Sequence, residues 1–66
     1  MNIVVNGAPR ELPPETGLVQ LLEMLGLRPE ATVVEHNGNV LERSTYGGVT
    51  LAEGDVLELV RFVGGG

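Results

Sequence analysis

The residues best suited to take part in a chemical reaction are the last three, because Gly64-Gly65-Gly66 ends in the α-carboxylate of the chain. Glycine lacks a Cβ, so an extended glycine segment can pass through a channel too narrow for other residues. Four residues from Val63 reach about 14 Å at most. An ionised carboxylate is a poor electrophile, but as an acyl-adenylate made with ATP it accepts a sulfur or amine nucleophile. This pattern predicts a tail of Val63, Gly64, Gly65 and Gly66 that enters a partner enzyme and is modified at Gly66. The alternative is a frayed end or a leftover linker.

The rest of the chain offers little for catalysis or metal binding. It has no cysteine and no lysine, one histidine (His36) and one serine (Ser44). A structural zinc site needs about four ligands, so we expect no metal site and a His36 that is exposed or partly packed. We interpret Glu53, Asp55 and Glu58 as a solvated acidic face. We therefore assign no catalytic residue and expect a protein that other enzymes modify. Because the chain has no lysine, further copies cannot be attached to its side chains to build a polymeric tag. This favours a protein that carries a chemical group over a protein that tags others.

Size and charge narrow the class of partner. A chain of 66 residues buries only about 60% of its unfolded surface and has an expected radius of gyration of roughly 11 Å. We therefore expect no enclosed pocket of about 300 Å³ or more. The net charge of −5 excludes nucleic acid and anionic membrane surfaces as partners and favours a protein with a basic face. The apolar runs are too short to span a membrane, no signal peptide is visible, and we expect a cytoplasmic protein.

The pattern of elements predicts an α+β domain in which one helix packs on a mixed sheet of four to five strands. Leu18, Leu21, Leu22 and Leu25 share one helical face. Thr16 or Gly17 is the expected N-cap, and Gly26 the expected end. Asn6-Gly7 and Asn37-Gly38 are typical of hairpin turns. We expect strands at residues 1–6, 10–12, 32–36, 40–41 and 56–63, with the first and last as the central pair. The domain would then comprise residues 1–63, followed by a flexible tail of residues 64–66.

The last strand carries hydrophobic residues on both faces. Leu57 and Leu59 alternate with Val60 and Phe62, so they point to opposite sides of a sheet. If the helix covers Leu57 and Leu59, Val60 and Phe62 point outward and form an apolar patch for docking a partner near the tail. The alternative is that Phe62 belongs to the core.

Several short motifs, taken together in order, resemble the ThiS family, the small ubiquitin-like sulfur carriers of thiamine biosynthesis. The likeness covers essentially the whole chain. It runs through Ile-Val-Val-Asn-Gly at 3–7, Leu21-Leu22 and Leu25-Gly26-Leu27, Asn37-Gly38, Arg43-Ser44 with Tyr46, Leu51, Gly54-Asp55 and Val63-Gly64-Gly65-Gly66. The chain departs from the family pattern at Gly17, where Thr is usual, at Tyr46, where Trp is common, and at Phe62, where a smaller residue is common.

The resemblance implies a ubiquitin-like β-grasp fold and a two-part cycle. A ThiF-like adenylating enzyme, using ATP and magnesium, would activate the Gly66 carboxylate, and a sulfur donor system would convert it to a thiocarboxylate, a C-terminal 1-thioglycine. A ThiG-like thiazole synthase would then take the sulfur for the thiamine thiazole. No cofactor is expected to bind the chain itself. Two alternatives remain: a MoaD-like sulfur carrier for molybdopterin synthesis, disfavoured by the short length and by Phe62-Val63 before the glycines, and a non-catalytic β-grasp interaction module whose tail is inert.

Overall fold

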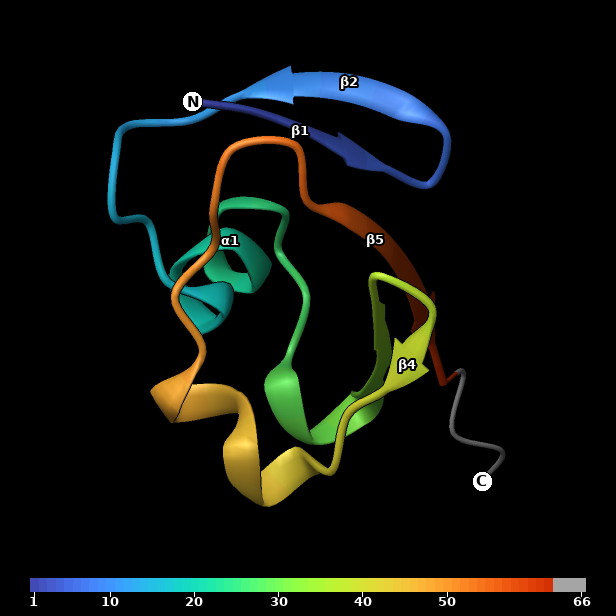
Figure 1. Ribbon diagram of the computed structural model, residues 1–66. Helices are drawn as coiled ribbons and strands as arrows, with labels where there is room; N and C mark the ends of the chain where they lie inside the picture. Colours follow the sequence, from blue (N-terminus) through green and yellow to red (C-terminus); the bar gives the residue numbers. More distant parts are fainter. Residues whose placement is uncertain (63–66) are drawn as a thin grey trace.

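A five-stranded mixed sheet curves around one helix in residues 1–62, the part of the chain that this computed structural model describes. The predicted tail of Val63, Gly64, Gly65 and Gly66 lies outside the described residues, and so does the predicted domain boundary. Helix α1 lies on the concave side of the sheet (Figure 1). The elements in chain order are β1 (Asn2–Val5), β2 (Ala8–Glu11), α1 (Leu18–Met24), η1 (Pro29–Ala31), β3 (Thr32–His36), β4 (Asn39–Val40), η2 (Arg43–Gly48) and β5 (Val56–Arg61).

The strand order β2-β1-β5-β3-β4 places the last strand in the middle of the sheet. β5 runs parallel to β1 and antiparallel to β3, which confirms the predicted central pair and the α+β class. The outer strands β2 and β4 are hairpin partners of β1 and β3. β2 starts earlier than predicted and includes Pro9, which is tolerated because an edge strand leaves one row of N–H positions unpaired. The radius of gyration, 11.3 Å, agrees with the value expected from the length.

Helix α1 has seven residues and ends before Leu25, which is its C-cap. Gly26 follows in the left-handed region with a φ of 72°, as predicted. Gly17 is the N-cap, and its backbone N–H donates to the Gln20 Oε1 atom at 2.8 Å. Leu18, Leu21 and Leu22 are fully buried, so a helix too short to be stable alone is held by its leucine face. No helix in residues 1–62 is long and apolar enough to cross a membrane.

Tyr46 joins the helical turn η2 to strand β3. Its ring is buried, its hydroxyl donates to the Thr32 carbonyl at 2.8 Å, and it accepts from the Val34 N–H at 3.2 Å. These bonds satisfy two backbone groups that face the core and would otherwise be buried without partners. The residue therefore fills the core and also completes the hydrogen bonding of β3. In the sequence, this position stands out only as an aromatic one.

Two Asn-Gly turns bond to the central strand through their asparagine side chains. Asn6 and Asn37 both have a φ of 50°. The Asn6 Oδ1 atom accepts from the Leu59 N–H at 2.7 Å, and its Nδ2 donates to the Leu59 carbonyl at 3.3 Å. On the other side of β5, the Asn37 Oδ1 atom accepts from the Val56 N–H at 2.8 Å. Each side-chain amide thus bonds to the backbone of β5, as the main chain of a neighbouring strand would.

We predict that Asn6→Gly destabilises the fold, because glycine keeps the turn but removes both bonds to Leu59. The expected loss is about 1–2 kcal/mol in the free energy of unfolding, measured by urea denaturation. Glu15→Gly is the matched control, since Glu15 also has a positive φ, 66°, and is exposed. This control should be neutral or slightly stabilising. Equal losses in the two variants would contradict a special role for the Asn6 side chain.

Candidate functional site

The two residues of the predicted docking patch are exposed on the side of the sheet away from α1. Val60 is 59% exposed and Phe62 58%, whereas Leu57 and Leu59 of the same strand are buried. The outward orientation is therefore confirmed, and the alternative that Phe62 belongs to the core is wrong. Phe62 directly precedes the predicted tail in the sequence. Its role in docking stays a prediction.

The exposed apolar surface is wider than sequence analysis anticipated. Val33 stands directly beside Val60 across the β3–β5 pair, and Val4 stands beside Val56 across the β1–β5 pair. Both neighbours are partly exposed. We call this side of the sheet, with Val4, Val33, Val56, Val60 and Phe62, the outer face. The neighbours were missed because only the register between strands that are distant in sequence brings them together.

A hollow of about 470 Å³ lies at the end of β5. Arg28 and Glu30 form an ion pair there, with the Arg28 Nη2 and Glu30 Oε1 atoms 2.8 Å apart. A hydrogen bond from its backbone N–H and another from Arg28 lower the pKa of Glu30 below its ordinary value. The hollow thus has two arginines, Arg28 and Arg61, in its lining at the end of the described residues. It is lined by Gly26, Arg28, Glu30, Ala31, Arg61 and Phe62.

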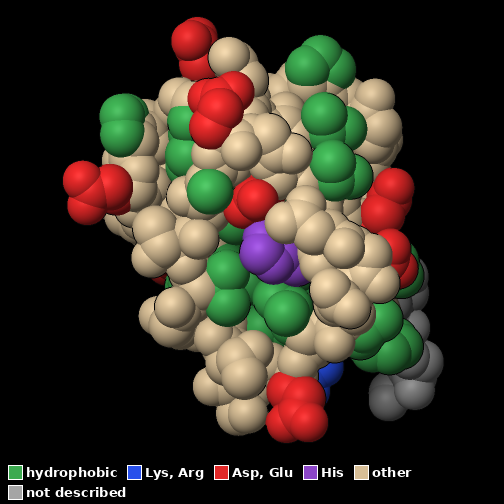
Figure 2. All heavy atoms as spheres, viewed as in Figure 1, with side chains coloured by type: hydrophobic (Ala, Val, Ile, Leu, Met, Phe, Trp, Pro, Cys, Tyr) green, Lys and Arg blue, Asp and Glu red, His purple; other side chains and the backbone are tan. Residues whose placement is uncertain are grey.

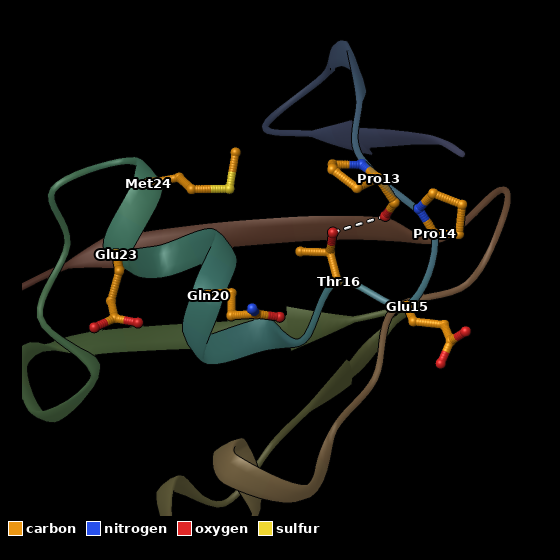
Figure 3. Close-up of a pocket in the computed structure, with 7 residues that line it drawn as sticks. All are labelled: Pro13, Pro14, Glu15, Thr16, Gln20, Glu23 and Met24. Atoms are coloured by element: carbon orange, nitrogen blue, oxygen red, sulfur yellow. Dashed lines mark hydrogen bonds between the residues drawn. The ribbon is translucent and has the colours of Figure 1, made fainter.

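A second hollow, of about 430 Å³, lies between α1 and the segment that leads into it. Figure 3 shows Glu23 and Met24 projecting from the helix, and Pro13 and Pro14 on the opposite side. The Thr16 hydroxyl donates to the Pro13 carbonyl at 2.7 Å and fixes that segment. Six of the seven lining residues are exposed, so this hollow is shallow. Both hollows are larger than about 300 Å³, but each is formed mainly by exposed residues and is open, so neither is the enclosed pocket that was excluded for so small a chain.

His36 reaches the surface in the space-filling view, where it is the purple side chain (Figure 2). Its side chain is 24% exposed, and its Nε2 atom lies 3.0 Å from the Asp55 Oδ2 atom. The prediction of a partly packed histidine is therefore confirmed. No group of three or more potential metal-binding side chains occurs within residues 1–62. The geometry assigns His36 to an interaction that holds the β3–β4 turn against the start of β5.

Asp55 corrects the prediction of a solvated acidic face, because only 8% of this residue is exposed. Besides the contact with His36, its carboxylate accepts from the Asn37 Nδ2 at 3.1 Å and from the Ala52 N–H at 2.8 Å. Burial by itself would raise the pKa of Asp55, but these hydrogen bonds outweigh it and lower the pKa below its ordinary value. Glu53 and Glu58 are exposed, as predicted. The sequence does not reveal this cluster, because its members are separated by the whole β4–η2 segment.

We predict that Asp55 makes the stability of the fold sensitive to acid. Its pKa in the folded chain lies below the ordinary value of 3.8, so its contribution is complete above that pH and is lost as the pH falls through the folded pKa. Asp55→Asn should lower the free energy of unfolding at pH 7 by about 1–3 kcal/mol. The difference between wild type and variant should shrink toward pH 2, measured by urea denaturation. A difference that stays constant over this range would contradict the assignment.

Comparisons with known proteins identify the family. The ThiS family model matches residues 3–66. The chain is 36% identical to the sulfur carrier protein ThiS of Bacillus subtilis over 63 residues, which cover 94% of this chain and 96% of that protein. It is also 47% identical over 66 residues to a thiazole synthase of Magnetococcus marinus and 36% identical to one of Paramagnetospirillum magneticum. The chain spans 20% of the length of each of these two synthases.

The fold agrees with this assignment. A crystal structure of the thiamine biosynthesis protein ThiS from Geobacter metallireducens superimposes on the chain with a TM-score of 0.83. The two chains are 38% identical, and the match covers 100% of each. A solution structure of a thiamine biosynthesis protein from the same organism gives a TM-score of 0.81 and covers 88% of that chain. The five-stranded sheet with one helix is thus the ubiquitin-like fold expected from the sequence, and the chain belongs to the ThiS family.

Proposed function

We propose that the chain is a sulfur carrier protein for the thiazole of thiamine. The observation that carries this proposal is the likeness to the sulfur carrier protein of Bacillus subtilis, which extends over nearly the full length of both proteins. The sequence ends in Gly64-Gly65-Gly66, the segment on which carrier chemistry depends. The sulfur would be carried at the carboxyl carbon of Gly66.

The chemistry has two balanced steps. In the first, a carboxylate oxygen of Gly66 attacks the α-phosphorus of ATP, pyrophosphate leaves, and an acyl-adenylate forms. In the second, a sulfur nucleophile attacks the acyl carbon and AMP leaves with the bonding electron pair. With hydrosulfide as the nucleophile, loss of the sulfur-bound proton then gives the thiocarboxylate, and no change of oxidation state is needed. Magnesium ions neutralise phosphate charge during the first step, and both ATP and magnesium belong to a ThiF-like adenylating enzyme.

In this scheme the chain is a substrate of other enzymes and not a catalyst. Val63, Gly64, Gly65 and Gly66 enter the partner, and small side chains let the partner approach the backbone closely. Phe62 and Val60 provide apolar surface beside the entrance. Activation with ATP requires a compartment that contains ATP, so we assign the protein to the cytoplasm.

A ThiG-like thiazole synthase is the proposed acceptor of the sulfur. Two thiazole synthases contain a stretch similar to the whole of this chain, which supports a functional connection between carrier and synthase. The adenylating enzyme is inferred from the chemistry, because a carboxylate must be activated before sulfur can replace its oxygen. These two enzymes and a sulfur donor form the proposed set of partners.

The proposed function predicts a defined change in mass. Incubation with a ThiF-like enzyme, ATP, magnesium and a sulfide source should exchange one oxygen of the chain for one sulfur, detected by intact-mass spectrometry. Deletion of Gly66 should abolish the exchange, and Glu23→Gln, which changes an exposed residue of α1, should leave it intact. A wild-type chain that keeps its mass with an enzyme active on its own carrier would overturn the proposal.

We predict that Phe62→Ala weakens binding to the adenylating enzyme more than it lowers stability. Because the side chain is exposed, the stability should change by no more than about 0.5 kcal/mol. The loss of a large apolar anchor should weaken binding about tenfold, measured by calorimetry. Met24→Ala is the matched control, since Met24 is an equally exposed large hydrophobic side chain on α1. A large drop in melting temperature with unchanged affinity would contradict the docking role.

A further inference from the structure

The outer face of the sheet has two carboxylates among its apolar side chains. Glu35 of β3 stands directly opposite Glu58 of β5. The adjacent pair in the same register, Val34 opposite Leu59, is buried under α1. Because side chains alternate along a strand, Glu35 and Glu58 point away from the helix. Residues directly opposite in an antiparallel pair have Cβ atoms about 4.5–5.5 Å apart. We call Glu35 and Glu58 the acidic pair.

Apolar side chains flank the acidic pair along the strands. Val33 and Val60 occupy the next outward positions on one side, followed by Phe62. Toward the start of β5, Val56 and its neighbour Val4 occupy the outward positions. Across the sheet, Val40 of β4 pairs with Glu35 and is exposed. An exposed apolar surface of this kind is typical of a protein contact, and here its centre carries two negative charges.

The described residues bring no cation to the acidic pair. Within residues 1–62 the ion pairs are Arg28 with Glu30 and His36 with Asp55. Arg61 stands opposite the buried Thr32 and therefore lies on the helix side of the sheet. Arg10 stands opposite the buried Ile3 and lies on the same side. Two like charges directly opposite each other destabilise a sheet. The chain keeps this unfavourable arrangement in the middle of a surface that is otherwise suited to binding.

We propose that the outer face docks on a partner protein whose apolar surface carries an arginine or lysine that inserts between Glu35 and Glu58. This inference rests on the proposed function and specifies the chemistry of the enzyme that handles the tail. A guanidinium can donate to both carboxylates at once, and such charge-assisted bonds are stronger than neutral ones. The apolar rows on either side exclude water from the pair, which further strengthens the interaction.

Charge decides between a partner enzyme and a second copy of the chain. Two copies that meet through their outer faces about a two-fold axis would bring two acidic pairs into one contact. Such a contact would enclose four carboxylates with no cation from the described part of the face. The acidic pair therefore opposes self-association of the apolar surface and favours a basic partner, in keeping with the net charge of −5.

The test compares two double variants that each remove two negative charges. Glu35→Gln with Glu58→Gln removes the acidic pair, and Glu23→Gln with Glu42→Gln removes two exposed carboxylates that are not on the strands. The affinity of each for a ThiF-like adenylating enzyme is measured by calorimetry, and the association rate is measured over a range of salt concentrations. The acidic-pair variant should bind about tenfold more weakly, with a reduced salt dependence of the association rate. The control should bind within about twofold of wild type.

Thermal unfolding of the variants provides the folding control. Loss of like-charge repulsion should raise the melting temperature of the acidic-pair variant by about 2–4 °C, so weaker binding would not reflect unfolding. Glu58→Lys is a second variant, because it would place an ammonium group opposite Glu35 and repel the partner's cation. It should bind more weakly than the glutamine variant.

Three results would overturn the inference. The first is an acidic-pair variant that binds as tightly as wild type with the same salt dependence. The second is a Glu58→Lys variant that binds more tightly than wild type. The third is a wild-type chain that sediments as a dimer and becomes monomeric on Val60→Ala, because a second copy would then occupy the outer face.

The mass experiment separates this inference from the proposed function. If wild type gains sulfur while the acidic-pair variant binds normally, the chain is a carrier and the inference falls. If wild type gains no sulfur but the acidic-pair variant binds more weakly than wild type and the control, the docking inference stands and the carrier function falls.

Discussion

The fold depends on hydrogen bonding along both sides of one strand, β5. This strand is the last of the five in chain order, yet it lies between β1 and β3 in the middle of the sheet. The backbone bonds Val4 N–H to Asp55 carbonyl and Asn6 N–H to Leu57 carbonyl, each 2.9 Å, join it to the first strand of the chain. Pairing elements so distant in sequence carries an entropy penalty. The penalty is offset because β5 also buries Leu57 and Leu59 against α1.

The central position of β5 also determines what the protein can offer to a partner. Since side chains alternate along a strand, a strand that supplies the core on one side must present its remaining residues on the other. In β5 those residues are Val56, Glu58 and Val60. The same strand leads directly to Phe62 and the tail. Core residues, outer face and proposed tail are therefore consecutive parts of one segment of the sequence, so the proposed partner would meet the outer face beside the point where the described chain ends.

Local patterns predicted the elements well. The spacing of Leu18, Leu21 and Leu22, the glycine at residue 26 and both Asn-Gly turns each depend on contacts within a few residues, and the structure confirms them. The exposure of Phe62 also followed from simple alternation once one face of β5 was assigned to the core. Element ends moved by one or two residues where a left-handed residue such as Asn6 stops a strand.

Contacts between distant segments could not be predicted from local patterns. The burial of Asp55 depends on partners in the β3–β4 turn, and the opposition of Glu35 and Glu58 depends on the register of β3 against β5. In the sequence, Asp55 and Glu58 are simply two acids near a glycine. Their different roles arise because Asp55 precedes the strand and faces inward, whereas Glu58 occupies an outward position within it.

The two asparagines that bond to β5 stand in Asn-Gly sequences, which are prone to deamidation. In an Asn-Gly sequence the backbone nitrogen of glycine can attack the side-chain amide carbon, because glycine leaves the approach open, and ammonia is lost. Here the amides of Asn6 and Asn37 are held by hydrogen bonds to Leu59, Val56 and Asp55, which restricts rotation toward that nitrogen. Deamidation at residue 37 would place a new carboxylate against that of Asp55. The contacts that hold the central strand thus also protect the two most labile amides of the chain for as long as it stays folded.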